Sequence, residues 1–152
     1  MTAYRLAVTT DLEQILALLR EIMEYHDFAP PPAADLSACV STILASQDHV
    51  FLVAEEHDQV VGMCALVFTM STWSAAPVCE IQDLVVTRAR RRSKVGRCLV
   101  EAAVQMAHER RCARIFLLAE YWNLQAHAFY RKLGLAEQTC LDFERDLRAQ
   151  LP

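Results

Sequence analysis

The chain has 152 residues, of which 54% are hydrophobic and 22% charged, with a formal net charge of −4 at pH 7. This length fits one domain whose core needs no disulfide or structural metal, and the composition excludes a disordered chain. No apolar run is long enough to span a bilayer, and residues 1–5 lack the layout of a signal peptide. We therefore expect a single cytoplasmic domain over residues 1–152, without a membrane partner.

The hydrophobic pattern predicts six strands and four helices in chain order, which fold as a mixed α/β sheet with helices on both faces. Strands are expected where short apolar runs are bounded by turn residues, and helices where apolar residues recur three and four apart. The expected strands are residues 2–8, 50–55, 60–68, 79–86, 113–119 and 140–146. The expected helices are residues 15–23, 36–45, one that begins near 96, and 123–133.

Local signals support several of these boundaries. Thr10 and Glu13 have the spacing of a helix capping box ahead of the first helix. A polar link at residues 56–59 predicts a hairpin between the second and third strands. Gly134 fits the stop of the last helix, whose apolar stripe runs from Ala126 to Leu133.

Six cysteines are spread along the chain, and none forms a C-x-x-C pair. Neither a zinc site nor a disulfide frame is indicated, and most of them lie in apolar runs where a thiol packs as a small hydrophobe. His108 and Cys112 are four residues apart on an expected helix, but a structural zinc needs four ligands. We expect no metal.

A compact basic segment, Arg88–Arg97, lies between the fourth strand and the helix that follows it. Six of its ten residues are Lys or Arg, whereas the first forty residues lean acidic. A strand that runs into a helix leaves backbone N–H groups at the positive end of the helix dipole, which suits phosphate. The alternatives are a solvated basic helix start, a nuclear-localisation or membrane-surface signal, and a nucleic-acid site. The overall acidity favours one small polyanion and no nucleic acid.

Two segments, residues 83–96 and residues 123–134, have spellings that resemble motifs of the GNAT superfamily of N-acetyltransferases. Residues 83–86 followed by Arg91–Gly96 resemble motif A, which is spelled R/Q-x-x-G-x-G/A after a strand. Residues 123–134, which read N-x-x-A-x-x-F-Y-x-K-L-G, resemble motif B. The E-Y-W-N sequence at 120–123 looks like a junction in the polyamine-acetylating branch. The resemblance covers residues 80–135 and is compatible with the element order elsewhere.

The resemblance implies the GNAT fold, a mixed and mostly antiparallel sheet of six to seven strands with helices on both faces. It also implies acetyl-coenzyme A as co-substrate, with its pyrophosphate on the amides of the basic turn and its pantetheine arm along the fourth strand. A backbone N–H there would hold the developing oxyanion. The residues implied at the coenzyme site are Leu84, Val85, Val86, Arg91, Arg92, Ser93, Lys94, Val95, Gly96, Arg97, Asn123, Phe129 and Tyr130.

The implied catalytic pair is Tyr130 and Glu80. Tyr130 occupies the position of the family's general acid, and with an ordinary pKa near 10 a tyrosine can give a proton to a thiolate; the alternative is a core aromatic. The family's frequent catalytic glutamate falls at Gln82, which cannot act as a base. Glu80 is the leading base, with Asp83 and Glu120 behind it, because strand alternation places Glu80, Gln82 and Leu84 on one face. Asn123 is equally an N-cap.

The sequence thus favours an enzyme that moves an acetyl group from acetyl-CoA to a primary amine of a small molecule. Acidic residues at the end of the first helix, Glu24 and Asp27, point to a cationic amine. A homodimer is expected from the family. Gln82, and Lys94 in place of a motif glycine, motivate the alternative of a degenerate domain that binds acyl-CoA as a sensor or interaction module without turnover.

Overall fold

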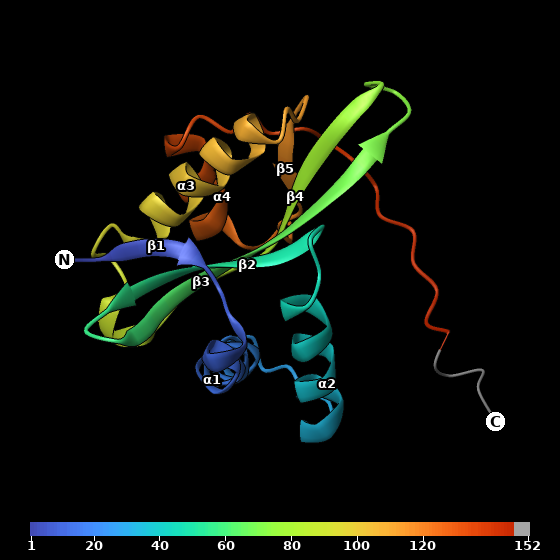
Figure 1. Cartoon of the computed structure of the whole chain (residues 1–152). Helices are drawn as coiled ribbons and strands as arrows, with labels where there is room; N and C mark the ends of the chain where they lie inside the picture. The colour runs from blue at the N-terminus through green and yellow to red at the C-terminus, as the bar shows by residue number, and fades with distance from the viewer. Residues whose placement is uncertain (148–152) are drawn as a thin grey trace. The chain divides into compact units, whose positions relative to one another are not determined.

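The computed structural model describes residues 1–147, which divide into two compact units, Met1–Glu120 and a second that begins at Tyr121 (Figure 1). The expectation of one domain over residues 1–152 stays a prediction. The first unit contains β1 (Ala3–Leu6), a 3₁₀ turn (Thr9–Asp11), α1 (Leu12–Tyr25), α2 (Ala33–Leu44), β2 (His49–Glu56), β3 (Gln59–Ser71), β4 (Ala76–Val86), a 3₁₀ turn (Arg88–Arg90), α3 (Val95–Glu109) and β5 (Ile115–Leu117). The second unit contains α4 (Leu124–Lys132).

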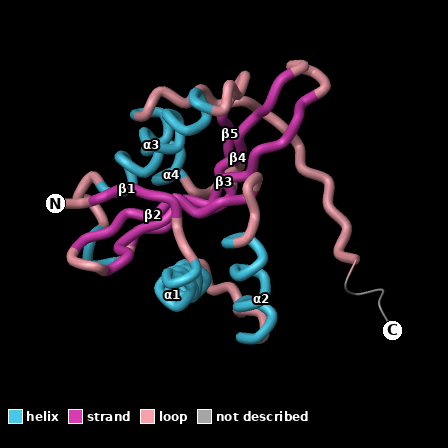
Figure 2. The backbone as a smooth tube through the Cα atoms, viewed as in Figure 1, coloured by secondary structure: helices cyan, strands magenta, loops and turns pink. Residues whose placement is uncertain are grey.

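The strands of the first unit form one sheet in the order β1-β2-β3-β4-β5 (Figure 2). The first four strands pair antiparallel, and β5 alone runs parallel to its neighbour β4. The predicted mixed and mostly antiparallel sheet is confirmed, but in residues 1–147 it has five strands instead of six to seven. α1 and α2 lie on one face of the sheet, and α3 lies on the other.

The strand predicted at residues 140–146 is wrong, because this segment has no regular structure. Its alternation is strand-like, but Leu141 and Phe143 are 80% and 88% exposed. A strand needs a neighbour that satisfies its backbone hydrogen bonds, and no ladder to this segment occurs in the described part of the chain.

The core on the α1–α2 face is built from apolar side chains of both helices and of the three central strands. Ile15 and Leu16 of α1 and Val40 of α2 pack with Met63 and Val85 of the sheet, all nearly inaccessible to solvent. On the opposite face α3 buries Leu99, Val100, Ala103 and Ala107. The apolar periodicity used to predict these helices therefore marks their buried sides.

Gly62 on β3 brings the start of α3 close to the sheet. A β-carbon at this position would lie 3.0 Å from the carbonyl oxygen of Val85 and 3.2 Å from side-chain atoms of Val95 and Leu99. The absence of a side chain therefore allows the first turn of α3 to pack directly over the end of β4.

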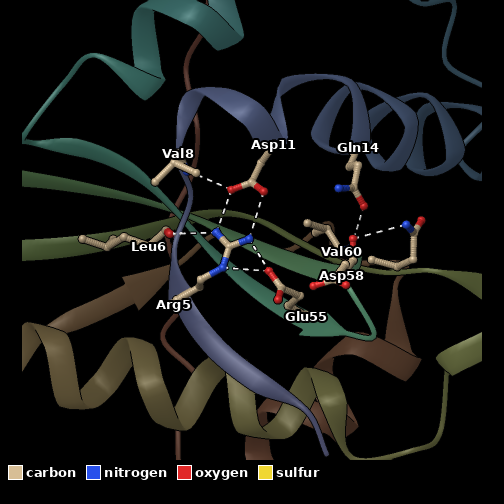
Figure 3. A network of polar contacts seen from close by, with 9 residues as sticks. Arg5, Leu6, Val8, Asp11, Gln14, Glu55, Asp58 and Val60 are labelled. Carbon is tan, nitrogen blue, oxygen red and sulfur yellow. Dashed lines mark hydrogen bonds and ion pairs between the residues drawn. The ribbon is translucent and has the colours of Figure 1, made fainter.

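A charged network fastens the start of α1 to the sheet (Figure 3). Arg5 of β1 binds both carboxylate oxygens of the buried Asp11, at 2.7 and 3.0 Å, and its Nε donates to Glu55 of β2 at 2.8 Å. Asp11 also accepts the backbone N–H of Val8 at 2.8 Å. The capping box predicted from Thr10 is therefore wrong: Asp11 and not Thr10 is the N-cap residue of α1, and its carboxylate binds Arg5 and the backbone N–H of Val8 instead of the first amides of the helix.

Replacing Asp11 by Asn is expected to lower the free energy of unfolding at pH 7 by about 2 kcal/mol, since it removes charged hydrogen bonds in a buried setting. The Arg5 guanidinium lowers the pKa of Asp11 below its ordinary value. The contribution is therefore complete above about pH 4, where the unfolded residue ionises, and is lost as the pH falls through the folded pKa.

Urea denaturation of both proteins between pH 3 and pH 7, about the range over which a carboxyl titrates, checks this prediction. Asp58→Asn, on the exposed β2–β3 turn, is the control that should change little. An Asp11→Asn difference that does not shrink toward low pH would contradict the assigned cause.

Candidate active site

The backbone between β4 and α3 adopts a strained conformation that opens the start of the helix. Arg92 and Lys94 have φ angles of 64° and 70°, in the left-handed region that favours glycine. Lys94 is the N-cap residue of α3, and its side chain makes no capping hydrogen bond. The first amides of α3, from Val95 to Arg97, therefore lack both an intrahelical acceptor and a side-chain cap.

The six cations of Arg88–Arg97 fall into two groups. Three are paired, through Arg90 with Glu56 at 2.6 Å, Arg91 with Glu21 at 3.2 Å and Arg97 with Glu101 at 2.7 Å. The other three, which are exposed and have no acidic partner within residues 1–147, are Arg88, Arg92 and Lys94. Lys94 is the N-cap residue of α3 and Arg92 precedes it by two residues, so unpaired cations adjoin the open helix start and the turn is suited to an anionic ligand.

Glu21 of α1 braces the turn, because it accepts hydrogen bonds from residues that directly follow β4. Its carboxylate accepts the backbone N–H of Arg88 at 2.7 Å, the hydroxyl of Thr87 at 3.1 Å and a guanidinium N–H of Arg91 at 3.2 Å. Arg91 also donates to the carbonyl oxygen of Val86 and lies over the ring of Tyr25, 4.8 Å from its centroid. Arg91 therefore holds the turn to α1 before any ligand is present.

A cavity of about 460 Å³ lies between this brace and the last turns of α1. Its lining residues are Glu21, Glu24, Tyr25, Arg88 and Arg91. Acidic and basic side chains both line this cavity. It therefore offers a ligand polar contacts beside the basic turn instead of an apolar surface.

The outer edge of β4 opens partway along the strand. Its parallel ladder with β5 joins Cys79, Glu80 and Ile81 to the three residues of β5 and stops there. Leu84, Val85 and Val86 remain paired with β3 on the inner side, where they are half-buried or buried. The carbonyl oxygen of Val86 accepts from Arg91, but the other backbone groups on the outer side of this stretch have no β5 partner and are available to a ligand that reaches the sheet from the turn.

A β-bulge lies at the same point. Asp83 pairs with Ala65 and Ile81 with Leu66, so Gln82 is an extra residue in β4. Because cross-strand partners share a face, Glu80 and Asp83 lie together on the α1–α2 face and Leu84 lies on the opposite face. The predicted alternation, with Glu80 and Leu84 on one face and Asp83 on the other, is wrong because the bulge resets it.

His49 at the start of β2 shares the face of these two carboxylates. The register joins His49 to Val67, and Val67 to Glu80, in one row across the sheet. Burial lowers the pKa of His49, whereas Asp83 and Glu80 act in the opposite direction. Asp83 is exposed as a whole residue, yet partial burial of its carboxyl raises its pKa, and the nearby His49 opposes that rise.

The remaining predicted residues lie in the second unit. Asn123 accepts the backbone N–H of Ala126 at 3.2 Å, which confirms it as the N-cap of α4. Phe129 and Tyr130 are half-buried neighbours whose rings meet edge to face at 5.2 Å. Gly134 has a φ of 83°, as expected of a helix stop.

Sequence reasoning missed His49 and Glu21. His49 is about thirty residues from Glu80 in the chain, and only the strand register brings them into one row. The signal in the sequence was that His49 alternates with the apolar Phe51 and Val53, which predicts that all three side chains lie on one face of the strand. Glu21 belongs to an amphipathic helix on which an acidic residue usually marks the solvated face.

Neither a metal site nor a membrane-spanning helix is found in the described part of the chain. Residues 1–147 contain no group of three His, Cys, Asp or Glu side chains placed to hold a metal ion. In the same range, no helix has the length and hydropathy of a membrane span.

Comparison with known proteins identifies the family. The Acetyltransferase (GNAT) family matches residues 12–135, so the chain belongs to it. "Uncharacterized N-acetyltransferase YhfO" of Bacillus subtilis (strain 168) is 28% identical over 138 residues, 89% of this chain and 90% of that protein. The thialysine N-epsilon-acetyltransferase of Bos taurus is 25% identical over 156 residues, 93% of this chain and 91% of that protein.

Solved structures agree with the fold. The aminoglycoside N-acetyltransferase AAC(6')-Iy in complex with CoA has a TM-score of 0.83 at 17% identity, over 97% of this chain and 95% of that chain. The predicted membership of the GNAT superfamily of N-acetyltransferases is thus confirmed.

The left-handed backbone at Lys94 leads to a prediction about stability. Lys94→Gly should unfold with a free energy about 1 kcal/mol higher than Lys94→Ala, because a non-glycine residue is strained at this φ. The two variants have the same charge, so the comparison isolates the backbone. Urea denaturation measures it.

Ser41, on the exposed side of α2, provides the control for this comparison. There the order should reverse, with Ser41→Gly about 1 kcal/mol less stable than Ser41→Ala. Equal stability of the two Lys94 variants would contradict a strained turn.

Proposed function

We propose that this protein transfers the acetyl group of acetyl-CoA to a primary amine of a small molecule. The observation that carries the proposal is that two features are adjacent. They are the open outer edge of β4 after Ile81 and the uncapped start of α3 beside the unpaired Arg92 and Lys94. The first suits the pantetheine arm and the second the pyrophosphate. The residues proposed for coenzyme contact are those implied by the family motifs, Leu84–Val86, Arg91–Arg97, Asn123, Phe129 and Tyr130.

Within the turn, we propose two roles for its residues, phosphate binding and support of the backbone, according to which side chains are already paired. The amides of Val95–Arg97 and the side chains of Arg92 and Lys94 would bind phosphate, while Arg91, already held by Glu21, would keep the turn in shape. A backbone N–H of β4 beyond the bulge would polarise the thioester carbonyl and hold the oxyanion.

The chemistry proposed is direct attack. The amine nitrogen bonds to the thioester carbon, the carbon–sulfur bond breaks, and the thiolate takes a proton from Tyr130. Glu80 stays the base proposed from the sequence, and Asp83 joins it on the same face of the sheet. A domain that only binds acyl-CoA is not favoured, because the relatives that match this chain over most of their own length are named N-acetyltransferases.

The proposed acceptor is cationic. Glu80 and Asp83 on the sheet and Glu24 at the cavity would attract an ammonium group. Related proteins are named for thialysine and for aminoglycosides, both of which carry amines. A cytoplasmic location and a homodimer stay predictions from the sequence.

Two measurements, made one after the other, test the proposed function. Acetyl-CoA should raise the melting temperature in a concentration-dependent way, as a ligand selective for the folded state must. Thiol release is then measured with lysine, spermidine and a 2-deoxystreptamine aminoglycoside. No thermal shift at millimolar acetyl-CoA would rule out the proposal, and a shift without thiol release would leave the binding-only domain.

Tyr130→Phe should lower kcat by about 100-fold, since it removes the acid that protonates the thiolate, and should leave acetyl-CoA affinity nearly unchanged. Tyr121→Phe is the matched control, because Tyr121 is 87% exposed in the same unit. An unaltered kcat in Tyr130→Phe would show that another group supplies the proton.

A further inference from the structure

The bulge in β4 creates an arrangement that strict strand alternation would not. With Gln82 displaced, Glu80 and Asp83 occupy adjoining rows on the α1–α2 face of the sheet. His49 ends the row of Glu80, with Val67 between them, and Phe51 ends the row of Asp83, with Ala65 between them. β2 and β4 are two strand spacings apart, about 10 Å, so the imidazole and the carboxylates lie on either side of β3.

His49 is held in place, but the Nε2 atom of its ring makes no hydrogen bond within the described residues. Its backbone N–H donates to the hydroxyl of Ser46 at 3.0 Å, and its ring lies against Phe51 with centroids 6.3 Å apart. The Nε2 atom is buried and has no hydrogen-bond partner among the described residues. A buried nitrogen without a partner costs stability, and a donor from a ligand would remove that cost.

The same face borders the open stretch of β4. The outer edge of β4 opens just after Ile81, and Asp83, the first regular residue beyond the bulge, projects on the side of His49. A thioester held along that edge would present its carbonyl carbon beside Asp83. An ammonium attracted by Asp83 and Glu80 would then lie between those carboxylates and the imidazole.

We propose that His49 is the base that deprotonates the acceptor ammonium, and that Asp83 and Glu80 stabilise the imidazolium formed. The proposal rests on the acetyl transfer proposed above and replaces Glu80 as the proton acceptor. Glu80 becomes a positioning residue, which attracts the substrate cation and then the imidazolium.

Deprotonation of the acceptor ammonium precedes its attack on the thioester. An N–H bond of the ammonium breaks, its electron pair stays on nitrogen, and the proton bonds to Nε2 of neutral His49. The amine then attacks the thioester carbon and the carbon–sulfur bond breaks. Tyr130 gives its proton to the thiolate and regains one from the nitrogen, which loses the second ammonium proton as the amide forms. His49 gives its proton to solvent, so one amide, one thiol and one proton leave in each turnover.

The protonation state of His49 suits this role. Burial lowers its pKa, so the imidazole is neutral at pH 7 and can accept a proton, while Asp83 and Glu80 favour its charged form. Other charged groups lie nearby. Asp48 precedes His49, Arg114 lies over Phe116 beside Glu80, and Arg110, which follows α3, is on the opposite face, over Phe68.

The test compares the pH dependence of kcat for acetyl-CoA-dependent thiol release, with whichever of lysine, spermidine or the aminoglycoside the wild type acetylates. His49→Gln should lower kcat by about 100-fold and remove the acidic limb of the profile. Asp83→Asn should move that limb to lower pH, because loss of the carboxylate lowers the pKa of His49. His108→Gln, at an exposed position of α3, is the control that should keep the wild-type profile.

An NMR titration of the histidine imidazole nitrogens provides a readout independent of turnover. The imidazole signal of His49 is assigned as the one that is missing from the spectrum of His49→Gln. In the wild type this signal should titrate at a lower pH than that of an ordinary histidine. In Asp83→Asn it should titrate at a lower pH still. Circular dichroism and the acetyl-CoA thermal shift check that each variant is folded.

The outcomes separate the two proposals. An active wild type whose kcat and acidic limb survive in His49→Gln overturns the role of His49 and leaves acetyl transfer intact. Loss of the limb in Glu80→Gln, and not in His49→Gln, assigns the base to Glu80. Absence of thiol release from the wild type itself overturns the proposed function, and the role of His49 with it.

Discussion

The end of the β4–β5 ladder at Ile81 is the constraint on which the rest of the site depends. A central strand normally satisfies its backbone groups on both sides, and β4 does so only as far as this residue. The Gln82 bulge lies at the same point and turns Asp83 onto the α1–α2 face. One interruption of regular pairing thus opens an edge to a ligand and gathers carboxylates beside it.

The basic turn depends on support from elements far away in the sequence. α1 reaches it through Glu21, which holds three donors of residues 87–91, and α1 is itself fastened to the sheet through Asp11 and Arg5. Gly62 lets the first turn of α3 lie against the end of β4. The left-handed backbone at Lys94 is therefore kept by its surroundings, and part of the folding free energy is stored as strain in the turn.

Most of the architecture could be predicted because it follows from local pattern. Apolar periodicity located the helices, the polar link between β2 and β3 marked a hairpin, and Asn123 and Gly134 marked the ends of α4. The bulge could not be predicted, since one extra residue in a strand leaves no local signature at Gln82. His49 was missed for a related reason, because its partners are defined by register across three strands. The prediction of a strand at residues 140–146 failed because an alternating pattern does not show whether a neighbouring strand is there to pair with.

The most direct test of this account is a titration of the isotope-labelled protein with acetyl-CoA, followed by amide ¹H–¹⁵N correlation spectra. The account predicts saturable shifts that are largest for Val95, Gly96 and Arg97 at the start of α3 and for Asp83–Val86 on the open edge of β4. Binding that leaves both groups of amides unperturbed at millimolar coenzyme, or that shifts a different face of the sheet, would contradict it.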